Sequence, residues 1–206
     1  MKHELIKDDN LTQLYFSYVE ATNDILVPHW HNHLEIIFLA EGSMTVYINE
    51  DSFELAPSDI SVVNPRDIHY THVHGSSRYY LLQIPSVHLA RICANWQLLH
   101  FREYLPHSGK GDSLNQKLTG ILAEFIRLNA TKERGHHLLF LIQLYRFLYL
   151  LYTEGSTLLS AETKKRTERD FTRIEESMQY VKRNYKRQIS LAEMAGYLSL
   201  TPEYFC

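Results

Sequence analysis

The sequence predicts an α+β protein with a β-rich barrel or sandwich in its N-terminal half and helices in its C-terminal half. Two observations support this division. Residues 34–85 contain short strand-like segments separated by turn residues at regular spacing, which is typical of an antiparallel sandwich or barrel. After Pro85 the apolar residues recur at intervals of three and four, which indicates amphipathic helices.

The composition is that of an ordinary globular protein. Of the 206 residues, 45% are hydrophobic and 22% are charged. The two cysteines, Cys93 and Cys206, provide no disulfide framework and suit a reducing compartment. The N-terminus has no apolar signal segment, and the most apolar run, residues 138–152, is interrupted by polar side chains and is short for a membrane span. We therefore expect a cytoplasmic protein without a membrane partner.

Charge is distributed unevenly along the chain, although the net charge is only −3. Residues 1–107 carry thirteen Asp and Glu against six Lys and Arg, whereas residues 164–206 carry nine basic against six acidic side chains. An acidic body with a basic end fits a ligand-binding domain joined to a segment that contacts phosphates. A solvated helix face would account for the same basic residues, so charge alone leaves both interpretations open.

The N-terminal half begins with a polar arm, Met1 to Asn10, and an alternating segment, Leu11 to Val19, that predicts a first strand. Six further strand-like segments follow: Ile36–Leu39, Met44–Ile48, Ser52–Leu55, Ile60–Val63, His69–Val73 and Tyr79–Ile84. Turn residues separate them, including Gly42 and the triplet Gly75-Ser76-Ser77. We therefore expect short strands joined by turns.

The stretch from Pro28 to Gly42 concentrates the chemistry of this half. It reads P-H-W-H-N-H-L-E-I-I-F-L-A-E-G. If it forms one strand, its side chains alternate between two faces. The polar face then carries His29, His31, His33 and Glu35. Imidazole and carboxylate groups are costly to bury unless they bind one another, water, a ligand or a metal. The pattern therefore predicts a binding site.

Three helical segments are expected between Ser86 and Tyr152. Ser86 is a candidate N-cap for the first, and residues 107–112 form a loop before the second, an amphipathic stripe that includes Leu114 and Leu128. The third, Leu138 to Tyr152, is apolar almost all round and needs partners on more than one face. Those partners are a second subunit or, alternatively, the interior of a monomer.

The C-terminal part predicts a linker and then a helix-turn-helix. Residues 155–167 are polar and charged, as in a linker. From Phe171 the chain is helical, and Ser190 with Glu193 forms a capping box for a second helix. Thr201 and Pro202 then restart a third helix after a tight turn. An unspecialised helical hairpin would give the same local pattern.

Both ends of the chain resemble one known architecture. The spacing of His29, His31, Glu35 and Gly42 resembles the first cupin motif. Pro65 and His69 resemble a degenerate second cupin motif, in which Asp59 and Asp67 replace the usual glycines. The C-terminal segment I-S-L-A-E-M-A-G-Y-L-S-L-T-P-E-Y-F resembles the first helix-turn-helix of AraC-family regulators, and so does the phrase H-W-H-N-x-x-E-I-I.

This resemblance implies a specific organisation. Residues 1–106 are expected to form a cupin-like jelly-roll barrel that senses a ligand, and residues 107–154 a helical segment that makes a homodimer. Residues 155–170 would be the linker, and residues 171–206 the first part of an incomplete DNA-binding domain, because the family carries two such motifs. Side chains expected near promoter DNA are Ser190, Thr201, Pro202, Glu203 and Tyr204.

Three interpretations compete for the barrel site. His29, His31, Glu35 and His69 match the ligand set of metallo-cupins, so a divalent metal is one interpretation, although no resident cofactor is required. A sugar is the second and is preferred, because regulators of this kind resemble carbohydrate sensors; its contacts would be His29, Trp30, His31, His33, Glu35, His69 and Tyr70. A purely structural role is the third. We expect a non-enzymatic transcription factor, with a metal-dependent isomerase or dioxygenase as the alternative.

Overall fold

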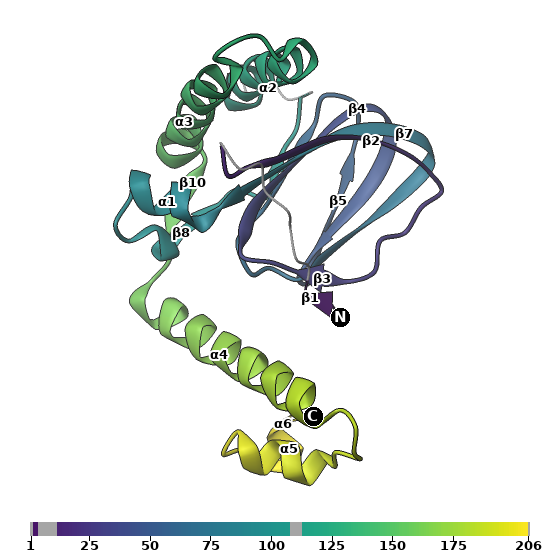
Figure 1. Cartoon of the computed structure of the whole chain (residues 1–206), viewed down its shortest axis with the longest axis vertical. Coiled ribbons are helices and arrows are strands. Elements are labelled where there is room, and N and C mark those ends of the chain that lie inside the picture. The colour runs from purple at the N-terminus through teal and green to yellow at the C-terminus, as the bar shows by residue number, and fades with distance from the viewer. Residues whose placement is uncertain (1, 4–11, 108–112, 206) are drawn as a thin grey trace. The chain divides into compact units, whose positions relative to one another are not determined.

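The computed structural model describes residues 2–3, 12–107 and 113–205. The chain separates into two compact units, Met1–Leu158 and Leu159–Cys206. The first unit contains a curled β-sheet flanked by helices, and the second is entirely helical in its described part (Figure 1). Within the described residues, no helix combines the length and the apolar character that a membrane span requires.

The sheet of the first unit is almost entirely antiparallel. Its strands are β1 (Lys2–His3), β2 (Tyr15–Thr22), β3 (His29–Trp30), β4 (His33–Ile48), β5 (Asp51–Leu55), β6 (Ile60–Val63), β7 (His69–Pro85) and β9 (Tyr104–Leu105). They follow the order β1-β3-β7-β4-β6-β9, while β2 pairs with β7 and β5 pairs with β4. Only the β1–β3 pair among these is parallel. The fold is α+β with a cupin-like barrel, as the sequence predicted.

Two strands are much longer than expected. β4 and β7 run through Gly42 and through Gly75-Ser76-Ser77, where the sequence indicated turns. The two strands pair with each other along nearly their whole length, with register shifts around Glu41. These residues were interpreted as turns because β-bulges and turns both favour glycine. In a β-bulge, however, the hydrogen-bonded ladder continues on either side.

Gly42 is the residue that this bulge requires. Its φ is +90°, and a Cβ at this position would lie 2.3 Å from Ser77 Oγ and 2.7 Å from Ser77 Cα. Ser77 also donates from Oγ to the Ser43 carbonyl and accepts from the Ser43 amide, both at 3.0 Å. Backbone strain and a clash with backbone atoms therefore coincide at one position.

We expect Gly42→Ala to lower the free energy of unfolding by at least about 2 kcal/mol because it adds both penalties. Urea titration followed by tryptophan fluorescence measures this unit, since Trp30 and Trp96 both lie in it. Gly120→Ala is the matched control. Its helical Cβ would meet no atom within 4 Å, so stability should be unchanged or rise by up to about 1 kcal/mol. Equal stability of the two variants would contradict the role of the bulge.

The first half of β4 lies between two hydrophobic cores, which explains its continuous apolar run. Ile37 and Leu39 point to the barrel interior with Met44 and Val46. Residues of the opposite parity, including Ile36, pack against the helices instead. A strand that is covered on both faces loses the alternation of a half-exposed strand.

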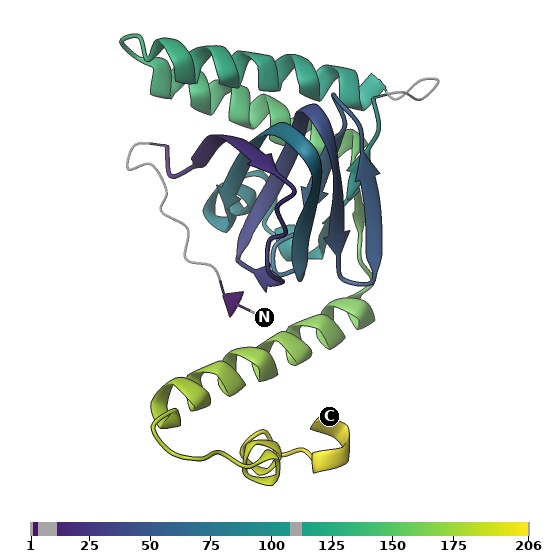
Figure 2. The same ribbon diagram turned by 90° about the vertical axis from the view of Figure 1, so that its right-hand side faces the viewer.

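The helices after the barrel pack on its outer face. The segment contains α1 (Ser86–Ile92), the 3₁₀ turn η1 (Trp96–Leu98), β8 (Leu99–Phe101), α2 (Ser113–Thr131), α3 (His136–Glu154) and β10 (Ser156–Leu158), which pairs with β8. α2 and α3 lie side by side along one side of the sheet (Figure 2). The predicted loop at residues 107–112 falls mostly outside the described residues.

α3 has two faces that the sequence did not separate. Its buried side chains are Phe140, Leu144, Phe147, Leu148 and Leu151. Its exposed large side chains are Leu138, Leu139, Ile142, Tyr149 and Tyr152. One face therefore packs on the barrel and α2, while an apolar face remains exposed in the single chain.

The second unit contains α4 (Ala161–Asn184), α5 (Leu191–Tyr197) and α6 (Pro202–Phe205). The segment that the sequence predicted as a linker, residues 155–170, contains β10 and the first turns of α4. Polar side chains with high helix propensity suit an exposed helix as well as a linker, so composition did not distinguish them. The helix, turn and helix of α5 and α6 are present as predicted, and the Leu200 amide donates to the Ala195 carbonyl at the turn.

Candidate functional site

The predicted barrel site is assembled from three strands. His29 comes from β3, His31 from the connection to β4, Glu35 from β4 and His69 from the start of β7. Antiparallel pairing places His29 opposite His69 and Glu35 opposite Gln83. His29, His31, Glu35 and His69 are at most 6% exposed. We refer to these four residues as the histidine–glutamate cluster.

Glu35 holds the cluster together. Its Oε2 lies 2.8 Å from His31 Nε2, and its Oε1 lies 3.6 Å from His69 Nε2. The ligand atoms of the three histidines all lie within 4.8 Å of one another. The side-chain amide of Gln83, which is also buried, donates to Glu35 Oε2 at 2.7 Å. One carboxylate on β4 therefore receives contacts from β7 and from the connection that precedes β4.

Backbone carbonyls orient the three rings. Nδ1 lies 3.0 Å from the Val27 oxygen in His29, 3.2 Å from the His33 oxygen in His31 and 2.9 Å from the Asp67 oxygen in His69. Because a carbonyl only accepts, Nδ1 carries hydrogen, and in a neutral ring the lone pair is then on Nε2. In His31 the second ring nitrogen, Nε2, also faces an oxygen atom, Glu35 Oε2 at 2.8 Å.

The protonation of Glu35 follows from these contacts. Burial by itself raises the pKa of this carboxyl, but the hydrogen bond with His31 and the nearby imidazole of His69 hold its pKa well below the usual range. Burial lowers the pKa of the His69 imidazole, but the adjacent Glu35 carboxylate together with the backbone carbonyl and the charge of Asp67 outweighs this, so its net pKa is raised. The cluster therefore favours an ionised carboxylate beside protonated imidazole.

The residues of the cluster fit a divalent metal. Three buried imidazoles converge, their Nδ1 atoms are oriented by carbonyls as metal-binding histidines usually are, and Glu35 adds an oxygen ligand. Imidazole with carboxylate suits Zn, Fe, Mn or Ni. The same groups also form hydrogen bonds to a polar organic molecule, so the donor set alone admits both kinds of ligand.

A family match adds to this geometry. Residues 12–148, more than half of the chain, match the model of the AraC-like ligand binding domain. The chain belongs to the AraC-like ligand-binding domain family. The matched range contains every residue of the histidine–glutamate cluster and both α1 and α2, and it ends within α3.

Solved structures give a weaker likeness. A cupin superfamily protein from Desulfitobacterium hafniense is 12% identical, with a TM-score of 0.34 over 35% of this chain and 67% of that chain. A cupin-2 domain containing protein from Shewanella frigidimarina is 16% identical, with a TM-score of 0.33 over 39% and 78%. Oxalate decarboxylase of Bacillus subtilis, which has Mn(II) centres, is 19% identical, with a TM-score of 0.32 over 35% and 21%. Similarities of this size do not indicate which ligand a protein binds or which activity it has. No curated protein matches the chain.

Three predicted contacts of the AraC-like domain lie outside the cluster. Tyr70 is on the opposite face of β7 from His69 and stacks on Tyr47, with ring centroids 4.3 Å apart. Tyr70 was expected among the sugar contacts, but neighbouring strand residues point to opposite faces. Trp30 is buried beside His29 in β3, where alternation directs it to the other face. His33 is half-buried, with its ring 5.8 Å from that of His31.

The predicted single strand from Pro28 to Gly42 is also corrected. The strand is interrupted between Trp30 and His33, where the His31 carbonyl accepts from the Arg66 amide at 2.8 Å. Because of this interruption, the side chain of His31 points toward the cluster although it does not lie on a continuous strand. The sequence predicted an inward His31 from strand alternation, whereas in the structure the break in the strand places it there.

Two residues of the AraC-like domain were missed by sequence analysis. Gln83 contacts Glu35 directly, and Tyr79 lies near enough for the Glu35 charge to act on it. Burial, with Glu35 and other charges adding to it, raises the pKa of Tyr79 to about 12. The sequence did contain a sign of both residues. Gln83 is a polar residue in the apolar segment Tyr79–Ile84, and strand alternation places it on the same face as Tyr79.

The described part of the N-terminal arm lies beside the cluster. β1 pairs in parallel with β3, with Lys2 opposite His29 and His3 opposite Trp30. The backbone at the start of the chain therefore runs along the strand that supplies the first histidine. Met1 and residues 4–10 of the predicted arm lie outside the described residues.

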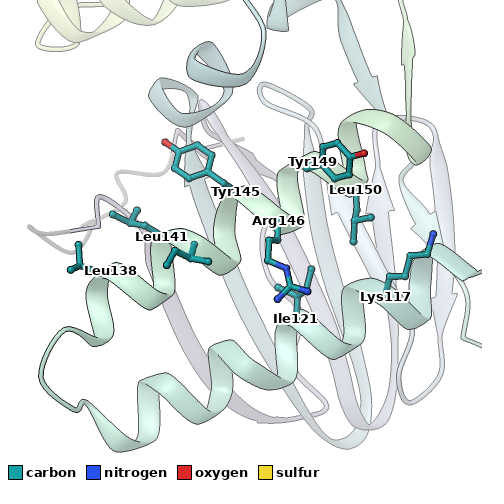
Figure 3. A pocket seen from close by; sticks show the side chains of 9 residues that line it. Lys117, Ile121, Leu138, Leu141, Tyr145, Arg146, Tyr149 and Leu150 are labelled. Carbon is teal, nitrogen blue, oxygen red and sulfur yellow. The ribbon is translucent and has the colours of Figure 1, made fainter.

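A second feature of the first unit is an apolar groove on α2 and α3. The groove has a volume of about 1100 Å³, with Lys117 and Ile121 from α2 on one side. Its other lining residues are Leu138, Leu141, Ile142, Tyr145, Arg146, Tyr149 and Leu150 from α3 (Figure 3). It contains much of the exposed apolar face of α3, the helix for which the sequence indicated either a second subunit or the interior of a monomer as its further partner.

The predicted DNA-facing residues lie around α5 and α6. Ser190 Oγ accepts from the Glu193 amide at 3.1 Å and caps α5. Glu193 does not complete the expected box, because its carboxylate pairs with Arg187 and Tyr180. Those contacts, Arg187 first, lower the pKa of Glu193 to about 2. Thr201, Pro202 and Glu203 lie at the start of α6, and the side chain of Tyr204 is outside the described set.

Proposed function

We propose that this protein is a dimeric transcriptional regulator whose barrel binds a small molecule and whose C-terminal helices bind promoter DNA. The observation that carries the proposal is the histidine–glutamate cluster, which lies inside an AraC-like ligand-binding domain. A chain that also contains a helix-turn-helix outline, α5 and α6, suits regulation better than catalysis. The protein then acts by binding and not as an enzyme.

A carbohydrate is the proposed class of effector. Glu35 offers carboxylate oxygens, Gln83 an amide and the three imidazoles donors or acceptors, all close together. Sugar hydroxyls both donate and accept, so they match such a mixed set. Buried polar groups also discriminate strongly against a ligand that leaves them unpaired, which gives specificity.

The groove on α2 and α3 is the proposed dimer interface. Leu138, Ile142 and Tyr149 are 58%, 54% and 63% exposed in the single chain. Large apolar and aromatic side chains gathered in one groove are typical of protein interfaces. A second copy that covers this face would remove them from water at a favourable free energy.

The proposed DNA contact uses the helices α5 and α6 together with basic residues of α4. Lys182, Arg183 and Lys186 lie at and just after the C-terminal end of α4 and are exposed, where they suit phosphates. The N-terminal turn of α6, with Thr201 and Glu203, would reach base edges in the major groove. A ligand changes DNA binding only if its affinity differs between two arrangements of the dimer.

The test combines ligand and DNA measurements. Thermal unfolding of the chain with a panel of monosaccharides should identify a sugar that stabilises it by about 2.7 kcal/mol at roughly one hundred times its Kd. The same sugar should change retention on duplexes selected from a random pool. His31→Gln should lose the thermal response, whereas His137→Gln, on α3 outside the cluster, should keep it. A full response in His31→Gln would place the sensor elsewhere.

A metal-dependent enzyme is the second candidate, because three imidazoles and a carboxylate converge. His29, His31, His69 and Glu35 would hold the metal, and a bound divalent metal would supply a Lewis acid that polarises an oxygen of the substrate. Metal analysis of the purified protein distinguishes the candidates. One tightly held metal per chain together with turnover of a substrate would favour the enzyme, whereas sugar binding after chelation would favour the regulator.

A further inference from the structure

A second cavity of the first unit lies apart from the histidine–glutamate cluster and from the groove on α2 and α3. It has a volume of about 480 Å³, within the range of small-molecule sites. β5, the short segment from β8 to β9, and the end of α3 with β10 contribute its lining. The lining residues that matter here are Phe53, His100, Arg102, Glu103, Tyr104 and Glu154.

Two aromatic rings form an apolar surface in this cavity. Phe53 and Tyr104 stack with ring centroids 5.6 Å apart and an interplanar angle of 23°. Tyr104 is fixed in place because its hydroxyl donates to Asp59 Oδ2 at 2.9 Å and its strand pairs with β6. The cavity therefore presents a rigid aromatic surface that needs no rearrangement to receive an apolar group.

Glu103 adds a carboxyl group to this cavity. Its side chain is 14% exposed, and its backbone carbonyl is fixed by the Val62 amide and the Ser61 hydroxyl. In the part of the chain that the structure describes, the ion pair recorded for it is with His100, at 3.6 Å, which is itself 40% exposed. This contact is too long and too exposed to neutralise a carboxylate fully.

The surroundings of Glu103 disfavour its negative charge. Burial, then the charges of Asp67 and of Asp51 on β5, raise the pKa of Glu103 to about 7. Glu154 at the end of α3 adds another carboxylate, although Lys117 pairs with it at 2.8 Å. Arg102 is the cation of the lining, and its side chain is exposed. A further cation next to Glu103 would offset the cost of burying its negative charge and the repulsion from the neighbouring carboxylates.

We propose that this cavity binds a small organic cation, a protonated amine with an apolar part, whose ammonium group pairs with Glu103 and whose apolar part lies on Phe53 and Tyr104. Ring faces attract cations as well as apolar groups, so both parts of such a molecule are accommodated. An anion would meet the charges of Glu103 and Asp51, and a neutral molecule would leave them uncompensated. The site is independent of the barrel effector.

Benzylamine is a suitable probe because it combines one ammonium group with one aromatic ring. We expect saturable binding in calorimetry, weaker binding of the neutral isostere benzyl alcohol, and amide shifts in NMR spectra confined to residues around the cavity. Glu103→Gln should weaken benzylamine binding about tenfold or more, because an ion pair in a partly buried site is lost. Glu133→Gln, an exposed carboxylate between α2 and α3, is the matched control and should leave binding unchanged.

The pH dependence gives a second readout. Benzylamine remains a cation around neutral pH, so its affinity should rise between about pH 6 and pH 8 as Glu103 loses its proton. The amide spectrum shows whether Glu103→Gln is folded, and Phe53→Leu provides a second variant that should weaken binding while the carboxyl remains. Equal affinity for benzylamine and benzyl alcohol, unchanged binding by Glu103→Gln, or absence of saturable binding to the parent chain would each overturn the proposal.

Discussion

Replacing Ile142 and Tyr149 together with glutamate is expected to convert the proposed dimer into a folded monomer. Both side chains are more than half exposed in the single chain and lie in the groove on α3. Two carboxylates there would cost little in the monomer but would be buried without partners in a dimer. Light scattering coupled to size exclusion should show the mass of two chains before the substitution and of one chain after it.

Two controls separate the interface from the fold. Leu148→Glu should unfold the first unit, because Leu148 is fully buried in the core, so this variant reports on folding and not on association. Ala123→Glu on the exposed part of α2 should leave the dimer intact. If the double variant remains dimeric, or if the parent chain is a monomer at micromolar concentration, the groove is not the interface.

Glu35→Gln is expected to have the second large effect, on both stability and effector binding. The substitution removes the charge that His31 and His69 share and leaves a buried imidazolium without its partner, which should cost roughly 3 kcal/mol at pH 6. Glu41→Gln on the same strand is the matched control. Its side chain is 64% exposed and pairs with Arg78, so its loss should change stability by less than about 1 kcal/mol.

The pH dependence of this difference has a defined sign. The folded-state pKa of Glu35 is lowered, so its contribution is complete above about pH 4.3 and is lost as the pH falls through that lowered pKa. The folded-state pKa of His69 is raised, so its contribution is complete below about pH 6.5 and is lost as the pH rises through it. The deficit of Glu35→Gln should therefore be largest between about pH 5 and pH 6.5. Urea titrations across this range measure it, and a deficit that is constant with pH would contradict the coupling.

Spacing in the sequence was sufficient to find most of the barrel site. His29, His31, Glu35 and His69 were named from their pattern and from the cupin resemblance, and the structure brings all four together. Polar groups in an apolar strand are informative because they are costly to bury alone. Tyr70 lies outside this cluster and stacks on Tyr47, because strand alternation directs it away from the face of His69.

Long-range pairing decided what local patterns left open. Gln83 joins Glu35 because β4 and β7 pair in one register across dozens of intervening residues, and no local rule specifies that register. The same pairing carries both strands through Gly42, where the sequence alone indicated a turn.

The sequence by itself determined the α+β class, the order of strands before helices, the histidines and Glu35 as candidate ligands, and the cap at Ser190. These follow from periodicity, burial cost and capping chemistry, which act over a few residues. Only the tertiary structure decided which face of α3 is exposed and that Phe53, Glu103 and Tyr104 share a cavity. These depend on contacts between segments that are distant in sequence, and their free energy is realised only when the chain is folded.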